Sequence, residues 1–183
     1  TVNDEYLIGF AKIFSQIAQR HNEVLSIKSP AGTLFAYINP KQQRVWQVSD
    51  HISFNQPWII SLADDAAAKQ LDVKTATNLV QWLWDLASTH GQKFEGLLDS
   101  HINYHIDRWV KPTHDADQHD HLKIQCVLEA RSLTIDDLVA RSQCSLPQVK
   151  KTLIGLFVAG ALLSSVYQQT IAQHKNKTNS QPV

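Results

Sequence analysis

Two histidines spaced four residues apart are the side chains of this chain whose types and spacing point most directly to chemistry. His101 and His105 flank Ile102-Asn103-Tyr104. On a helix, residues four apart share one face, and two imidazoles placed in this way can bind zinc. A third ligand could come from the Asp- and His-rich run 107–121. The segment therefore predicts a candidate metal site at His101 and His105.

The same histidines allow two other interpretations. They can be polar flank residues of a helix that leads into a solvated linker, because spacing alone does not impose the convergent geometry of a metal site. They can also sense pH, because several histidines would gain charge together below about pH 6.5. The two cysteines, Cys126 and Cys144, form no paired motif and are expected to be buried, reduced thiols. We therefore expect no bound cofactor.

Motifs for catalysis are absent from the sequence. It contains no Gly-x-Ser-x-Gly nucleophile motif, no Gly-rich phosphate loop ending in Lys, and no Gly-x-Gly-x-x-Gly dinucleotide fingerprint. These absences favour a binding or regulatory module over an enzyme.

A second candidate site lies on an expected helix, Leu146 to Ala159, whose outward positions are predicted to be Gln148, Lys150, Lys151 and Thr152. Lys and Thr can hold phosphates, and Gln can read adenine in the major groove. However, five basic and four acidic residues lie between His119 and Gln168, a net charge of +1. Readers of DNA usually concentrate more positive charge on one face. DNA binding through this helix is therefore the alternative hypothesis, and protein docking is the leading one.

The elements around this helix predict a winged-helix-like domain over residues 122–168. Thr134 to Asp137 reads as a capping box, Ser145 to Gln148 reads as a second one, and Gly160 ends the helix that follows. Apolar residues at helical spacing, Leu146, Val149 and Leu153 among them, are expected to face inward. The predicted elements are helices over 122–130, 135–141 and 146–159, followed by a strand over 161–167.

The first part of the chain predicts an α+β domain over residues 1–111. An apolar stripe marks an N-terminal helix, and alternation with turn signals then predicts an antiparallel meander. The expected strands are 24–28, 34–38 and 44–48, with another near 52–60, and the expected helices begin at Asp64 or Asp65 and span 75–90 and 94–109. A polar linker is expected at 112–121 and a mostly disordered tail at 169–183.

Composition places the chain among ordinary globular proteins. Of its 183 residues, 43% are hydrophobic and 19% are charged, and its net charge is +0. It has no apolar run of about 20 residues, so we expect no membrane span and a cytoplasmic location. It also contains no methionine, so we expect it to be a piece of a longer protein.

Three short segments resemble the opening of the PATAN family of regulatory domains. They are Glu23-Val24-Leu25-Ser26-Ile27, Gly32-Thr33-Leu34-Phe35-Ala36-Tyr37-Ile38 and Arg44-Val45-Trp46, after an amphipathic helix. Some members also end in a helical segment like 122–163. The resemblance implies a non-enzymatic signalling or scaffold module that binds protein partners or itself, in pathways of response regulators or surface motility. It assigns no functional residue.

Overall fold

Five strands and seven α-helices make up the described part of the chain, which covers residues 4–19, 22–113 and 116–180 of a computed structural model. The predicted α+β class is confirmed. The elements are α1 (Asp4–Ala18), β1 (Leu25–Lys28), β2 (Leu34–Asn39), β3 (Arg44–Gln47), β4 (Ile59–Leu62), α2 (Asp65–Lys69), η1 (Val73–Thr75), β5 (Thr77–Asn78), α3 (Leu79–Phe94), η2 (Glu95–Leu97), α4 (Gln118–Ala130), α5 (Ile135–Ser142), α6 (Leu146–Val158) and α7 (Ser164–Asn179).

The sheet is antiparallel and has the strand order β4-β1-β2-β3-β5. The predicted meander forms its centre, with Leu25 opposite Ile38 and Ile38 opposite Val45. Gly32, with φ +88°, allows the tight connection between β1 and β2. β4 follows the loop 48–58 and pairs with β1, so it forms one edge of the sheet.

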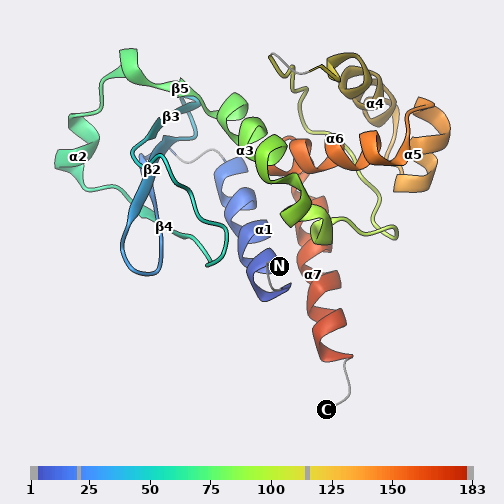
Figure 1. The fold of residues 1–183 in the computed structure, drawn as a ribbon, viewed down its shortest axis with the longest axis horizontal. Coiled ribbons are helices and arrows are strands. Elements are labelled where there is room, and N and C mark those ends of the chain that lie inside the picture. The colour runs from blue at the N-terminus through green and yellow to red at the C-terminus, as the bar shows by residue number, and fades with distance from the viewer. Residues whose placement is uncertain (1–3, 20–21, 114–115, 181–183) are drawn as a thin grey trace.

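One hydrophobic core joins the sheet to the helices. Phe14 of α1 lies at its centre: its ring centroid is 6.4 Å from that of Trp58, 5.7 Å from that of Phe94 and 6.1 Å from that of Phe157. In Figure 1 the sheet and α4–α6 lie on opposite sides of the molecule, with α1 and α3 between them. The sheet half and the α4–α6 half therefore share one core.

α3 differs from the predicted helix at both ends. Its start lies at Leu79 because Thr77 and Asn78 pair with β3, and the Asn78 side chain accepts a hydrogen bond from the Gln81 N–H as the N-cap. The helix also continues past Gly91, its predicted end, to Phe94. The backbone of His90 leaves helical geometry there, at φ −119° and ψ 15°, so α3 is kinked at the predicted stop.

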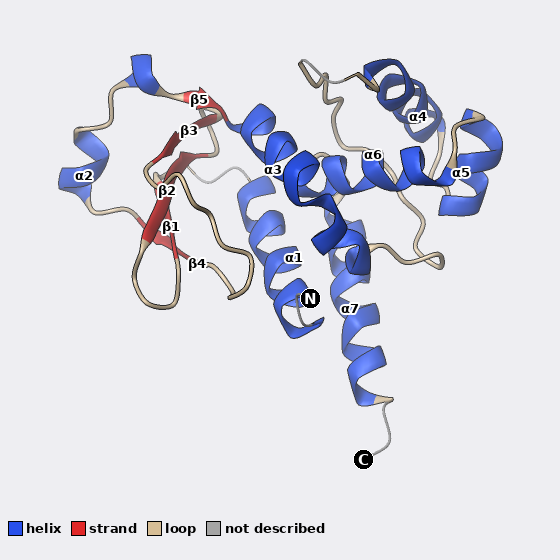
Figure 2. Cartoon of the chain, in the orientation of Figure 1, coloured by secondary structure: helices blue, strands red, loops and turns tan. Residues whose placement is uncertain are grey.

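The predicted helix over residues 94–109 is wrong. After η2 the chain leaves helical structure and continues as a loop (Figure 2). Isolated bridges join Tyr104 to Leu133 and Ile106 to Leu162. Tyr104 and Ile106 are both buried at a spacing of two residues, as in a strand. The sequence has apolar residues at both the helical and the strand spacing, and pairing with distant segments decides between them.

α4, α5 and α6 match the predicted three helices closely. The Thr134 side chain caps α5, and Ser145 and Gln148 form the predicted capping box at α6. α4 begins at Gln118, inside the stretch 112–121 that was predicted as a linker.

The strand predicted after α6 and the disordered tail are both wrong for the described residues. The chain makes the single bridge at Leu162 and then enters α7, which runs from Ser164 to Asn179 and packs on α1. α7 buries four residues, Val166, Tyr167, Thr170 and His174. Because two of these four are polar, the composition of the segment did not reveal the buried face. Residues 181–183 lie outside the described part.

Asp99 ties the end of α7 to the loop after η2. Its Oδ2 lies 2.9 Å from Lys177 Nζ, and its Oδ1 accepts a hydrogen bond from the His101 N–H at 2.8 Å. Burial raises the pKa of Asp99, but the hydrogen bonds from Lys177 and His101 outweigh it, so the net pKa lies below the ordinary 3.8. The folded state therefore gains stability from ionised Asp99 above this ordinary value and loses it as pH falls through the lowered pKa.

Asp99→Asn should lower the free energy of unfolding at pH 7 by about 1 kcal/mol, because Lys177 is solvent-exposed and screened. In this variant the melting temperature should also fall less steeply than in the parent chain as the pH is lowered from about 5 to about 2. Thermal melts over this range, with the exposed Asp50→Asn as control, measure both effects. An unchanged acid limb in Asp99→Asn would refute the assignment.

No helix within the described ranges has both the length and the apolar character needed to cross a membrane.

Candidate functional site

The helix proposed to enter a DNA groove, α6, lies inside the core. Its residues from Thr152 to Val158 are all buried. α3 crosses α6 at Gly155, where an added Cβ would lie 2.6 Å from Cζ3 of Trp84. α4 and α5 pack on α6 as well. α6 therefore has neighbours on several sides, which leaves little of its surface for a DNA groove.

Thr152 was predicted to face outward, and this is wrong. Thr152 is fully buried, and its Oγ1 lies 2.6 Å from Nδ1 of the buried His121 of α4. The hydroxyl also donates to the Gln148 carbonyl at 2.9 Å. The rings of Trp84 and His121 meet edge to face, with centroids 5.0 Å apart. Position 152 therefore belongs to a polar contact between α4 and α6.

The other three predicted contact residues lie near the N-terminal end of α6, where two of them meet acidic side chains. Gln148 donates a hydrogen bond to Asp120, and Lys151 Nζ forms an ion pair with Asp117 at 2.9 Å. Lys150 is half-buried. These acidic partners offset the positive charge that phosphate binding requires. Leu146, predicted to face inward, is 42% exposed at the first position of α6.

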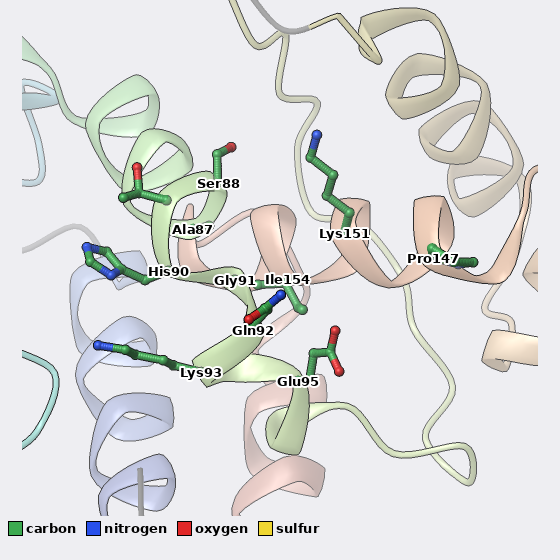
Figure 3. Close-up of a pocket in the computed structure, with 11 residues that line it drawn as sticks. Ala87, Ser88, His90, Gly91, Gln92, Lys93, Glu95, Pro147, Lys151 and Ile154 are labelled. Atoms are coloured by element: carbon green, nitrogen blue, oxygen red, sulfur yellow. The ribbon is translucent and has the colours of Figure 1, made fainter. Parts of the chain in front are cut away.

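A cleft of about 460 Å³ lies between the second half of α3 and the start of α6. Figure 3 shows His90 and Lys93 projecting to one side of α3, whereas Lys151 and Glu95 lie on the other side. Burial, and secondarily the charge of Lys93, lowers the pKa of His90 below 6.5, and the imidazole lies 4.7 Å from the Phe54 ring. The charged groups do not converge on one point, so the cleft lacks the arrangement of a small-ligand site.

The predicted metal pair does not share a helix face, because residues 98–113 are not helical. His101 is exposed in a turn, whereas His105 lies in the extended segment and its buried Nδ1 has no hydrogen-bond partner. Among the described residues, no group of three or more His, Cys, Asp or Glu side chains is placed to hold a metal ion. His114 and Asp115, in the run that was to supply a third ligand, lie outside the described part.

β4 carries two exposed large hydrophobic side chains, Ile59 and Leu62. It has the sequence Ile59-Ile60-Ser61-Leu62, with neither a charge nor a proline. Ile59 is 48% exposed and Leu62 is 61% exposed. Natural proteins usually protect an edge strand with charges, prolines, bulges or a cover, because its free backbone groups can pair with another chain. β4 itself carries no such charge or proline.

The direction of the free backbone groups of β4 follows from its pairing with β1. The Ala63 N–H donates to the Val24 carbonyl at 2.9 Å. Because bonded pairs alternate along an antiparallel ladder, residues 59, 61 and 63 direct their backbone groups toward β1. The N–H and C=O groups of Ile60 and Leu62 then point away from β1, out from the open edge of the sheet.

No family model, curated protein or solved structure matches this chain. The sequence predicts a strand near residues 52–60 but does not predict its position at the edge of the sheet. The apolar run Trp58 to Ile60 was visible, but the edge position depends on pairing with β1, about 35 residues earlier in the chain.

Proposed function

We propose that this chain is a non-enzymatic interaction module that binds an extended segment of a protein along β4. The observation that carries the proposal is the exposed, uncharged edge strand itself, with Leu62 61% exposed. Addition of a strand to a sheet edge is a common mode of peptide recognition. This proposal agrees with the scaffold role implied by the PATAN resemblance, whose link to response regulators stays a prediction.

The chemistry of such binding follows from the two sets of groups on β4. The outward N–H and C=O groups of Ile60 and Leu62 supply main-chain hydrogen bonds, which favour any extended segment. Ile60 and Leu62 are directly opposite the buried Ile27 and Leu25 in the register, so they lie on the core face of the sheet. A partner with apolar side chains at alternate positions would extend this face and remove Leu62 from water.

A selection of seven-residue peptides displayed on phage, against the immobilised chain, tests the proposal. We expect enrichment of sequences with alternating apolar residues. Leu62→Lys should weaken binding of the selected peptides by about tenfold, equivalent to about 1.4 kcal/mol, because a charge on an edge strand opposes strand addition. Isothermal titration of synthetic versions of the selected peptides measures this change.

Val48→Lys is the matched control, since Val48 is 56% exposed and follows β3, which is separated from β4 by two strands. It should leave peptide affinity unchanged. Selected peptides that bind Leu62→Lys as tightly as the parent chain would contradict the proposed function.

A further inference from the structure

We propose that the segment added to β4 is β4 of a second copy of this chain, paired antiparallel about a two-fold axis at Ser61. This inference rests on the proposed function and specifies its partner. The two five-stranded sheets would then form one continuous sheet across the axis. Such a contact is isologous, because each copy offers the same residues to the other.

The hydrogen-bonding groups of β4 fit this axis. A two-fold axis at Ser61 places Ile60 of one copy opposite Leu62 of the other, and Leu62 opposite Ile60. These are the two residues whose N–H and C=O groups point away from β1. Each of the two pairs can therefore exchange both backbone hydrogen bonds, with Ser61 and its copy between them as a non-bonded pair.

The side chains of β4 match across the same axis. Directly opposite residues of an antiparallel pair point to the same face of the sheet. Ile60 and Leu62 of both copies would therefore form one apolar cluster on the core face. On the opposite face the two Ser61 side chains would meet, and each Ile59 would lie beside Ala63 of the other copy. Apolar side chains of one copy thus face apolar side chains of the other, and Ser61 of one copy faces Ser61 of the other.

The charges next to β4 do not conflict in this register. Lys28 is opposite Ile59 in the β1–β4 pair, and Asp64 and Asp65 follow Ala63, the residue after β4. The axis places Ala63 of one copy beside Ile59 of the other, and Asp64 and Asp65 opposite the uncharged Trp58 and Pro57. Within residues 57–65, no two like charges are therefore directly opposite, so charge repulsion does not oppose the contact.

Sedimentation equilibrium from about 1 µM to about 1 mM tests whether the chain dimerises. We expect a concentration-dependent dimer. Leu62→Lys should weaken dimerisation by about tenfold or more, because the two introduced charges would lie within the apolar cluster. Val48→Lys should dimerise like the parent chain. Circular dichroism and melting temperature check that both exposed substitutions leave the fold intact.

Disulfide trapping tests the register. In a Cys126→Ser background, which removes the exposed native thiol, Ser61→Cys should form a disulfide-linked dimer on mild oxidation. Side chains of a non-bonded antiparallel pair have Cβ atoms about 4.5–5.5 Å apart, close enough for a bridge after small adjustment. Ile59→Cys is the control, because its neighbour across the axis is Ala63. Equal trapping at position 59 would overturn the register.

The outcomes separate this inference from the function on which it rests. A chain that stays monomeric at all concentrations, while selected peptides still bind in a Leu62-dependent way, overturns the second copy and supports the proposed function. A dimer that persists unchanged in Leu62→Lys places the contact elsewhere and overturns the inference. A monomer that binds no peptide overturns both.

Discussion

Phe14→Ala is expected to lower the free energy of unfolding by about 3–5 kcal/mol, the usual cost of removing a fully buried aromatic ring. Phe14 has no exposed surface, and its ring meets Trp58, Phe94 and Phe157. These partners come from the loop before β4, from α3 and from α6. A cavity at Phe14 therefore removes contacts in the sheet half and in the α4–α6 half together.

Hydrogen exchange followed in both halves during urea unfolding measures this effect. Amides of β2 and of α5 should lose protection at the same urea concentration, and Phe14→Ala should lower both midpoints equally. Tyr6→Ala, on the same helix but only partly buried, should have a smaller effect. Separate midpoints for β2 and α5 would show that the halves unfold independently, contrary to a single core.

The sequence allowed accurate prediction where local chemistry decides the structure. Thr134 and Ser145 are N-caps whose hydrogen bonds reach only three residues along the chain, and the helices they start were found within one residue. The meander was also recognisable, because its turns connect neighbouring strands. Such features need no knowledge of distant segments.

Predictions failed where contacts with distant segments determine the local structure. Tyr104 and Ile106 become extended because they pair with Leu133 and Leu162. α7 is stable because one face packs on α1, at the opposite end of the chain. The α-helical period in residues 94–109 and the polar composition after 169 carried no information about these partners.

The candidate sites show the same division. Thr152 was assigned an outward position because helical periodicity assumes one buried face, whereas α6 has neighbours on several sides. His121, which contacts Thr152, and Trp84, which packs on His121, lie far away in sequence. The edge position of β4 could not be predicted either, since strand order in a sheet is not encoded in the strand itself.

Gly155→Ala should destabilise the protein by about 1–3 kcal/mol, although alanine favours a helix over glycine by about 1 kcal/mol. The added Cβ would lie 2.6 Å from Cζ3 of Trp84. The indole is 2% exposed, so it has no open space into which to move. The close crossing of α3 and α6 must therefore widen, and this contact holds the two halves of the core together.

Chemical denaturation of four variants, Gly155→Ala, Gly91→Ala, Trp84→Phe and the double variant at positions 84 and 155, isolates this contact. Gly91→Ala is the matched control in α3: an added Cβ there meets nothing within 4 Å, so it should be neutral or stabilise by up to about 1 kcal/mol. Trp84→Phe, a smaller ring, should relieve the clash, so that adding Gly155→Ala to it costs about 1–2 kcal/mol less than in the parent chain. Additive effects at positions 84 and 155 would refute a direct contact. Coupling would mean that α3 already covers the face of α6 at Gly155, so that this face cannot contact DNA.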